Sequence, residues 1–281
     1  MALGLAWGMS DDDLELNRTR WDALAAVHGQ DAFYDAEGLV AGRRDLRQAE
    51  AAAVAQAVPD LRGRDVIHIQ CHIGFDTIAL ARRGARVTGV DFSRASLVKA
   101  ADLAGRCGVE IEWVQADAAA LPDSLDGRFD LAYATLGAIC WIEDIGAWMR
   151  CAAATLRPGG RLVLVEIHPV YAMVEAAGEP LRLDFPYAFD GPRRFDAPGS
   201  YADPDAPVQV TAEVVYAHSL GEVVNAAIAA GLRIDALHEH LESDVDPRGD
   251  LLTRGEDGRY RLMVSGERLP VLFTLLAARP A

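Results

Sequence analysis

The segment from Asp65 to Asp91 constrains the fold of this chain more than any other. It reads as an apolar strand, a tight turn around Gly74, an alanine-rich helix and a second apolar strand that ends in an acidic residue. This order predicts one βαβ unit, and hence a parallel sheet with a right-handed crossover. In such sheets a ligand binds beyond the carboxyl ends of the strands, where an acid ending the second strand can accept both ribose hydroxyls. Asp91 is well placed for that role.

The rest of the chain continues to alternate strands and helices. Apolar residues recur at strand or helix spacing in each of these segments. The expected strands are 66–70, 86–90, 110–115, 129–134, 161–167, 208–216, 233–240 and 269–276, and the expected helices are 14–28, 45–58, 75–83, 143–156 and 220–230. A further helix begins after Ser93, a typical N-cap residue. We expect the first two helices to lie over the sheet.

Residues 170–207 interrupt this alternation. They are rich in proline, glycine, aspartate and aromatic residues and show no clean period. An irregular segment of this length inside one domain is typical of a lid or a binding insertion.

Composition narrows the class of partner. The chain has 281 residues, of which 51% are apolar, enough for the core of one large α/β domain. Acidic residues outnumber basic ones by 42 to 27, so the surface should repel nucleic acids and anionic membranes, and we expect neither as a partner. The four cysteines show no paired spacing, and no stretch reads as a secretory signal or a membrane span, which favours a cytoplasmic protein. A homodimer stays open.

The turn after the first strand narrows the choice of ligand. Dinucleotide-binding proteins carry glycines there, because bare backbone must approach a pyrophosphate. Gln70 and His72 occupy two of these positions, so a pyrophosphate would clash. S-adenosylmethionine has a nucleoside and no phosphate, and Gln70 or His72 could contact the ammonium and carboxylate of its methionine half.

From about residue 21 to residue 240 the chain resembles the class I S-adenosylmethionine-dependent methyltransferases. The motifs that carry the resemblance are HIQCHIGFDT at 68–77, GVDFS at 89–93, FD at 129–130, RPGG at 157–160, EIHP at 166–169 and HSLGE at 218–222, together with Trp21, His28 and Tyr34. The first motif and EIHP are similar to those of a bacterial subgroup with HLQCHxGxDT and E-x-H-P. Against the wider class, His68 replaces an acid of the first strand, and Gln70 and His72 replace loop glycines.

The resemblance implies a doubly wound, Rossmann-like and mostly parallel seven-stranded sheet. It also implies an N-terminal helical cap and an insertion between strands five and six. The corresponding divisions are a cap at 1–60, a cofactor-binding core at 61–169, a substrate-binding lid at 170–215 and the C-terminal part of the core sheet at 216–281.

The resemblance also implies a role for individual residues at the cofactor. Asp91 would hold the ribose, Phe92 would pack on the adenine, and Asp117 would accept its amino hydrogen bond beside the backbone of Ala118. Thr135 would face the methionine portion. The remaining expected cofactor contacts are Tyr34, Gln70, His72 and Gly74. The residues alone leave open that Asp117 is a turn acid and Thr135 a helix cap.

Methyl transfer from a sulfonium depends mainly on positioning, because the leaving group is a neutral thioether. A base is needed only if the acceptor atom carries a proton. His168 and Glu166, at the end of the fifth strand, are the candidates, although His168 could instead fix the lid. We expect the residues that line the acceptor pocket to be Trp141, Tyr187, Tyr201 and His218. His218 could equally belong to a helix cap with Glu222, and Trp21, His28 and Tyr34 are expected to close over the cofactor.

These observations predict an S-adenosylmethionine-dependent methyltransferase that acts on a small molecule, with specialised metabolism as one setting. One alternative is a protein of the same fold that binds S-adenosylmethionine without methylating. Another is an NAD-dependent oxidoreductase, which explains Asp91 but fails at Gln70 and His72. No metal is expected, because a strand-and-turn spacing does not bring His68 and His72 together as a helix would, and His238 and His240 have no third ligand near in sequence.

Overall fold

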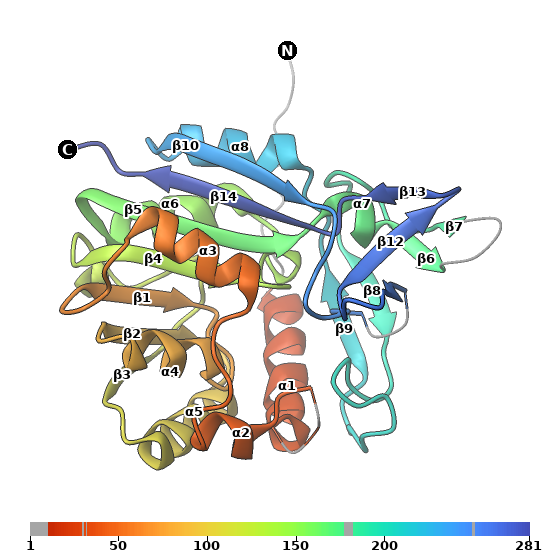
Figure 1. Cartoon of the computed structure of the whole chain (residues 1–281), viewed down its shortest axis with the longest axis horizontal. Helices are drawn as coiled ribbons and strands as arrows, with labels where there is room; N and C mark the ends of the chain where they lie inside the picture. Colours follow the sequence, from red (N-terminus) through yellow and green to blue (C-terminus); the bar gives the residue numbers. More distant parts are fainter. Residues whose placement is uncertain (1–10, 30, 32, 177–181, 249–250) are drawn as a thin grey trace.

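The computed structural model describes residues 11–29, 31, 33–176, 182–248 and 251–281 (Figure 1). Its centre is a seven-stranded sheet in the order β10-β14-β5-β4-β1-β2-β3. Strands β1 to β5 are parallel, whereas β14 runs antiparallel to both β5 and β10. The strands are β1 (Asp65–Ile69), β2 (Arg86–Asp91), β3 (Ile111–Gln115), β4 (Phe129–Thr135), β5 (Leu156–Ile167), β10 (Arg233–His240) and β14 (Leu272–Ala278). The mostly parallel, doubly wound sheet predicted from the sequence is confirmed.

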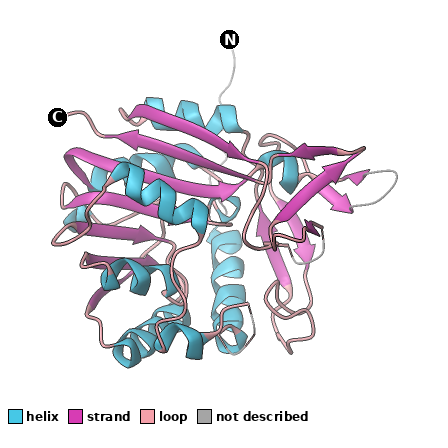
Figure 2. Cartoon of the chain, viewed as in Figure 1, coloured by secondary structure: helices cyan, strands magenta, loops and turns pink. Residues whose placement is uncertain are grey.

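Helices cover both faces of the sheet (Figure 2). On one face lie α3 (Gln48–Ala57), α4 (Phe75–Arg82) and α5 (Arg94–Cys107), and on the other lie α6 (Ile145–Thr155) and α8 (Leu220–Ala229). Val66 and Leu131 pack towards α3 and α4, whereas Ile67 and Leu164 pack towards Trp148 of α6. Burial on both faces explains why these strands read as nearly continuous apolar runs. Ser93 caps α5 as predicted, since its hydroxyl accepts the N–H of Ser96.

The first helix does not lie over the sheet, so that prediction was wrong. Helix α1 (Asp11–Val27) stands beside the carboxyl ends of the strands and packs mainly against α5 and β9 (Ala212–Val215) (Figure 1). The side chain of Asn17 exchanges two hydrogen bonds with the backbone of Val214, and Arg20 donates to the carbonyls of Gly199 and Val210. The part of α1 that meets β9 and the insertion is therefore polar, whereas Leu24 and Ala25 near its end are buried apolar residues.

A second lobe adjoins the carboxyl edge of the sheet. Its elements are α7 (Pro169–Ala172), β6 (Val174–Ala176), β7 (Arg182–Leu183), β8 (Arg193–Asp196), β9, β11 (Thr253–Arg254), β12 (Tyr260–Val264) and β13 (Glu267–Leu269). The strand expected at 269–276 begins later, at Leu272, because Pro270 has no N–H to donate and Leu269 ends β13. Short helical segments complete the chain: α2 (Ala36–Val40), η1 (Asp123–Leu125) and η2 (Ile139–Trp141). Within the described ranges, no helix combines the length and apolar character needed to cross a bilayer.

Gly74 fixes the approach of the loop after β1 to its neighbours. It is the N-cap of α4 and has a φ of 79°. A Cβ there would lie 2.8 Å from Trp113 Cη2 and 2.9 Å from the Cβ of Ala100. Gly108 ends α5 and has a φ of 68°. A Cβ added to Gly108 would have no described heavy atom within 4 Å.

We expect Gly74→Ala to lower the free energy of unfolding more than Gly108→Ala does. Both variants carry a left-handed strain of roughly 1–2 kcal/mol. Only Gly74→Ala adds overpacking, typically about 1–3 kcal/mol. Urea denaturation of the two proteins measures the difference, and equal losses would contradict the close packing at Gly74.

Candidate functional site

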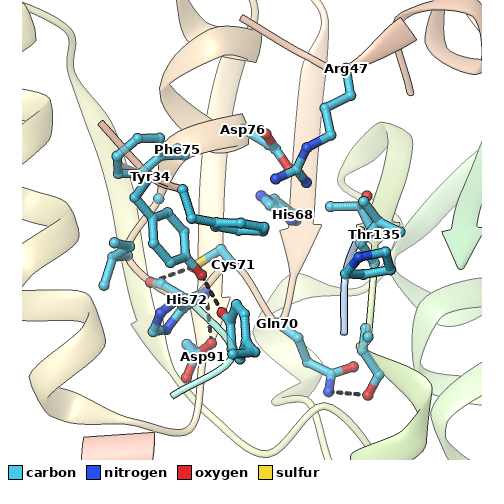
Figure 3. A pocket seen from close by; sticks show the side chains of 18 of the residues that line it. Tyr34, Arg47, His68, Gln70, Cys71, His72, Phe75, Asp76, Asp91 and Thr135 are labelled. Carbon is cyan, nitrogen blue, oxygen red and sulfur yellow. Dashed lines mark hydrogen bonds between the residues drawn. The ribbon is translucent and has the colours of Figure 1, made fainter. Parts of the chain in front are cut away.

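A cavity of about 280 Å³ lies at the carboxyl ends of β1, β2 and β4 (Figure 3). We call it the first cavity. The loop 70–75, Asp91 with Phe92, and the segment 135–138 form one side of its wall. His68, Asp76, Cys140, Trp141 and Ile167 also line it. Further lining residues come from outside the core sheet: Trp21, Phe33, Tyr34, Leu39, Arg44, Asp45, Arg47, Tyr201, Val245 and Pro247. The crevice beyond the carboxyl ends of parallel strands is where this kind of sheet binds ligands.

In the loop after β1, two residues larger than glycine adopt the left-handed backbone conformation that glycine favours. Gln70 has a φ of 60° and His72 a φ of 48°, and such conformations cost a non-glycine residue roughly 1–2 kcal/mol. The amide of Gln70 donates to the carbonyl of Ala138 at 2.8 Å and accepts from the indole N–H of Trp148 at 2.9 Å. Hydrogen bonds to the segment after β4 and to α6 thus offset the strain. The expected contact of Gln70 with a cofactor stays a prediction.

Asp91 lies at the end of β2 and is only 6% exposed. Its carboxylate accepts the backbone N–H of His72 at 2.8 Å and that of Ser93 at 2.9 Å. Burial raises the pKa of this carboxyl to about 6, because the charged form loses solvation. Asp91 and the neighbouring Phe92 both line the first cavity.

Aromatic rings from the N-terminal segment and the insertion meet over this cavity. The ring of Trp21 stands edge-on to those of His72 and Trp141, with centroids 4.9 and 5.2 Å away. Tyr34 and Tyr201 share a hydrogen bond between their hydroxyls. The structure therefore brings the predicted residues Tyr34, His72, Trp141 and Tyr201 together.

A chain of hydrogen bonds runs beneath these rings. His28 Nδ1 lies 2.7 Å from His72 Nε2, and His72 Nδ1 lies 3.0 Å from the hydroxyl of Ser96. The other nitrogen of His28 bonds to Ser200 of the insertion. Burial lowers the pKa of both histidines, that of His28 to about 4, so both rings are neutral near pH 7.

Sequence reasoning missed a charged group at the other end of the first cavity. Figure 3 shows the side chains of Arg47 and Asp76 pointing towards one another. Burial, together with the nearby carboxylate of Glu50, raises the pKa of Asp76 to about 8. Glu50 itself accepts the hydroxyl of Thr135 at 2.9 Å. Asp76 lies within the first motif and could have been found there, but no local signal links it to Arg47 or Glu50.

His68 lies beside this charged group and also lines the first cavity. Its Nδ1 lies 2.8 Å from the hydroxyl of Thr77, and its Nε2 is buried without a hydrogen-bond partner among the described residues. Burial lowers the pKa of His68 to about 3. In the described part of the chain, no cluster of three or more histidine, cysteine, aspartate or glutamate residues could hold a metal ion.

Asp117 and Ala118 are not brought to the first cavity. The carboxylate of Asp117 accepts the N–H of Ala119 at 3.0 Å, which is the turn arrangement left open above. Their contacts with an adenine remain predictions.

A second cavity of about 380 Å³ adjoins the first, and Cys140 and Ile167 line both. Its wall includes Met173, Phe185 and Phe195 from the lobe. Two of the predicted acceptor-pocket residues, Tyr187 and His218, lie here, whereas Trp141 and Tyr201 line the first cavity.

Comparison with known proteins agrees with this architecture. Residues 66–160 match the family model described as a methyltransferase domain. A ubiquinone biosynthesis O-methyltransferase from Alkalilimnicola ehrlichii is 31% identical over 144 residues, which are 51% of this chain and 56% of that protein. Residues 66–160 are thus similar to a methyltransferase domain, in line with the resemblance noted in the sequence. The chain matches only about half the length of such curated relatives.

Solved structures show the same fold. An S-adenosylmethionine-dependent methyltransferase from Mesorhizobium loti is similar with a TM-score of 0.59 and 23% identity, covering 82% of this chain and 98% of that one. The magnesium protoporphyrin IX methyltransferase of Synechocystis, solved with bound S-adenosylmethionine, has a TM-score of 0.52 at 16% identity, covering 97% and 99%.

His168, which follows the last residue of β5, has a hydrogen bond at each ring nitrogen. Its Nε2 lies 2.9 Å from the carboxylate of Glu239, and its Nδ1 accepts the N–H of Val170 as the N-cap of α7. His168 is 2% exposed and lines neither cavity. This geometry favours the alternative in which His168 fixes the segment after β5 over its role as a base.

The side chain of Glu166 is also engaged in hydrogen bonds within the protein. Its carboxylate accepts the backbone N–H groups of Gly137, Ala138, Ile139 and Ile167. The side chain lines the second cavity but is 2% exposed. It holds the segment after β4, where the two cavities meet, and its expected catalytic role has no support from these contacts.

We expect Glu166→Gln to lower the free energy of unfolding by about 1.5–3 kcal/mol, because an amide NH₂ must then face a backbone N–H. Glu239→Gln is the matched control, since the Glu239 side chain is 52% exposed and should cost under about 1 kcal/mol. Urea denaturation compares the two. A loss for Glu166→Gln no larger than for the control would contradict the structural role.

Proposed function

We propose that the chain is an S-adenosylmethionine-dependent methyltransferase that methylates a small-molecule acceptor. The observation that carries this proposal is the buried Asp91 carboxylate in the wall of the first cavity. Beside it, Gln70 and His72 occupy positions where a pyrophosphate would need glycine. A nucleoside cofactor without phosphate fits this combination, and an NAD-type cofactor does not.

The charged and aromatic groups of the first cavity fit the rest of that cofactor. Its methionine half is a zwitterion, which needs one cation and one anion. Arg47, and Asp76 once it has lost its proton, would supply them. Nε2 of His68, which has no hydrogen-bond partner among the described residues, is a further polar group beside Arg47 and Asp76. Aromatic faces stabilise cations, and Trp21 and Tyr34 line the cavity where the sulfonium would lie. Phe92 would pack on the adenine, with Tyr34, Gln70, His72, Gly74, Thr135, Asp117 and Ala118 as further proposed contacts.

When bound, this cofactor supplies an electrophilic methyl group and leaves as a neutral thioether. The residues of the chain then have to position the acceptor and exclude water. The second cavity adjoins the first at Cys140 and Ile167, and its walls come mostly from the insertion. We assign the acceptor to this cavity, with Tyr187 and His218 in its wall and Trp141 and Tyr201 at the boundary with the cofactor. The division into cap, core, lid and C-terminal part is proposed on the same basis.

Calorimetry with S-adenosylmethionine, S-adenosylhomocysteine and NAD tests the cofactor. Binding of the first two and not of NAD is expected. Methyl-labelled cofactor incubated with a panel of small acceptors then tests transfer. Binding of NAD alone would end the proposal, and tight S-adenosylmethionine binding without any transfer would favour the non-methylating alternative.

We expect Asp91→Ala to weaken binding of S-adenosylhomocysteine by at least about tenfold, because hydrogen bonds to a charged group contribute roughly 1.5–3 kcal/mol each. Asp22→Ala is the matched control. Its carboxylate accepts the Ser93 hydroxyl and the Ala95 N–H nearby but lines neither cavity. Affinities from calorimetry, with urea denaturation of both variants, separate lost binding from lost folding. Equal affinities in the two variants would contradict the ribose assignment.

Cofactor binding should release a proton near pH 7. In the free protein the pKa of Asp76 is about 8, so the carboxyl is mostly protonated at pH 7. An ammonium group beside it favours the charged form and lowers its pKa, so the proton leaves on binding. At pH 9 the carboxyl is already ionised, and this release disappears.

Calorimetry with S-adenosylhomocysteine in buffers of different ionisation enthalpy measures the proton count. Asp76→Asn should abolish the release at pH 7. Asp22→Asn is the control, because that carboxylate bonds to Ser93 and lines neither cavity. A release that persists in Asp76→Asn would exclude Asp76 as its source.

A further inference from the structure

One carboxylate in the wall of the second cavity is poorly paired. Glu213 of β9 lines this cavity, and its side chain is 18% exposed, so part of it remains accessible. Its ion pair within the described residues is with Arg20, whose Nε lies 3.4 Å from Oε2. This is longer than the roughly 2.7–2.9 Å of a strong charge-assisted hydrogen bond. No described residue donates a hydrogen bond to the other oxygen, Oε1.

Arg20 is held by other groups and cannot pair fully with Glu213. Its terminal nitrogens donate to the backbone carbonyls of Val210 and Gly199, at 2.6 and 2.9 Å. Only its Nε is left for the carboxylate, so the strong two-pronged pair of a guanidinium with a carboxylate does not form. Burial raises the pKa of the Glu213 carboxyl, and Arg20 offsets this only in part.

The other charged side chains of this wall have partners or face solvent. Glu166 accepts backbone N–H groups of the segment after β4, Glu175 has an arginine partner, and Asp184 is exposed. Arg248 is the only arginine or lysine among the described residues of the wall, and it donates to backbone carbonyls of α7 and β6. The wall therefore carries more negative than positive charge, and Glu213 is the group best able to accept a cation.

Glu213 lies close to the place where the two cavities meet. Cys140 lines both of them, and the nearby carboxylates of Glu166 and Glu213 add to the effect of burial in raising the pKa of its thiol. The hydrogen bonds of Asn17 with the backbone of Val214 hold the strand that carries Glu213. A cation paired with Glu213 would sit near the cofactor, and the two carboxylates would offset its repulsion from the sulfonium.

On the basis of the proposed function, we propose that the acceptor is a small amine with an apolar body, and that Glu213 binds its protonated nitrogen. The body packs against the apolar part of the wall, which includes Met173, Phe185, Phe195 and Val215. A cationic ligand also suits the chain as a whole, because acidic residues outnumber basic ones by 42 to 27 and attract cations to the surface. Glu213 thus determines specificity, whichever atom of the amine receives the methyl group.

Matched ligands that share a body and differ in charge test this inference. One set is tyramine, propylphenol and hydroxyphenylpropionate, and another is hexylamine, hexanol and hexanoate. Calorimetry measures the binding of each compound to the protein saturated with S-adenosylhomocysteine. In at least one set, we expect the amine to bind at least about tenfold more tightly than its neutral and anionic counterparts, because only the amine gains a hydrogen bond to a charged group.

Glu213→Gln removes the charge and keeps an oxygen that can accept from Arg20. We expect it to weaken binding of the amine by about tenfold and binding of the neutral compound by less than about threefold. Glu15→Gln is the matched control, since this exposed carboxylate of α1 pairs with Arg18 and lines neither cavity. It removes the same charge from the chain and should leave every affinity unchanged. Urea denaturation checks that both variants fold.

Three results would overturn the inference while S-adenosylhomocysteine still binds. The first is that no amine is preferred over its counterparts, which includes the case in which none of the compounds binds. The second is a preference for the amine that persists in Glu213→Gln. The third is an equal loss for all members of a set in Glu213→Gln, which would show a merely structural role. Failure of the unaltered chain to bind S-adenosylhomocysteine would instead overturn the proposed function itself.

Discussion

The hydrogen bonds accepted by the Asp91 carboxylate are the constraint on which the rest of the site depends. They join the N–H of His72, in the loop after β1, to the N–H of Ser93, at the start of α5. Ser93 also donates its hydroxyl to Asp22 of α1. One buried carboxylate thus fixes the loop, and Ser93 links it to the N-terminal helix. The raised pKa of Asp91 shows that burying this charge has a cost, which the two backbone donors partly offset.

The core sheet could be predicted from the sequence because its signals are local. Strands β1 and β2 are buried on both faces, and their apolar runs and the turn at Gly74 identify them without tertiary information. The position of α1 could not be predicted in this way. Its polar residues resemble a solvated face, but Asn17 bonds to Val214, 197 positions away. Polarity along a helix does not reveal whether water or backbone satisfies it.

The same limit applies to the candidate site. Asp91 was found because a strand end and an acidic residue together specify its chemistry. His168 also ends a strand, yet its two nitrogens are engaged by Glu239 and by its own helix cap, which sequence position cannot show. Arg47 and Asp76 meet only because the segment before α3 folds back over the start of α4. Sequence thus gives the edge of the sheet, and tertiary contacts decide which polar groups remain available there.

The proposed cofactor and acceptor cavities are connected through the backbone as well as through the residues that line both. Helix α1 places Trp21 at the first cavity, and its Asn17 bonds to Val214 of β9. Strand β9 continues directly into Tyr216, whose backbone N–H donates to the carbonyl of Cys140, a residue common to both cavities. His218 follows two residues later. The hydrogen bonds of α1 thus connect the wall of the first cavity to the backbone that continues into the wall of the second. The buried polar residues of α1 make this link, and their polarity is also what hid the position of the helix from sequence reasoning.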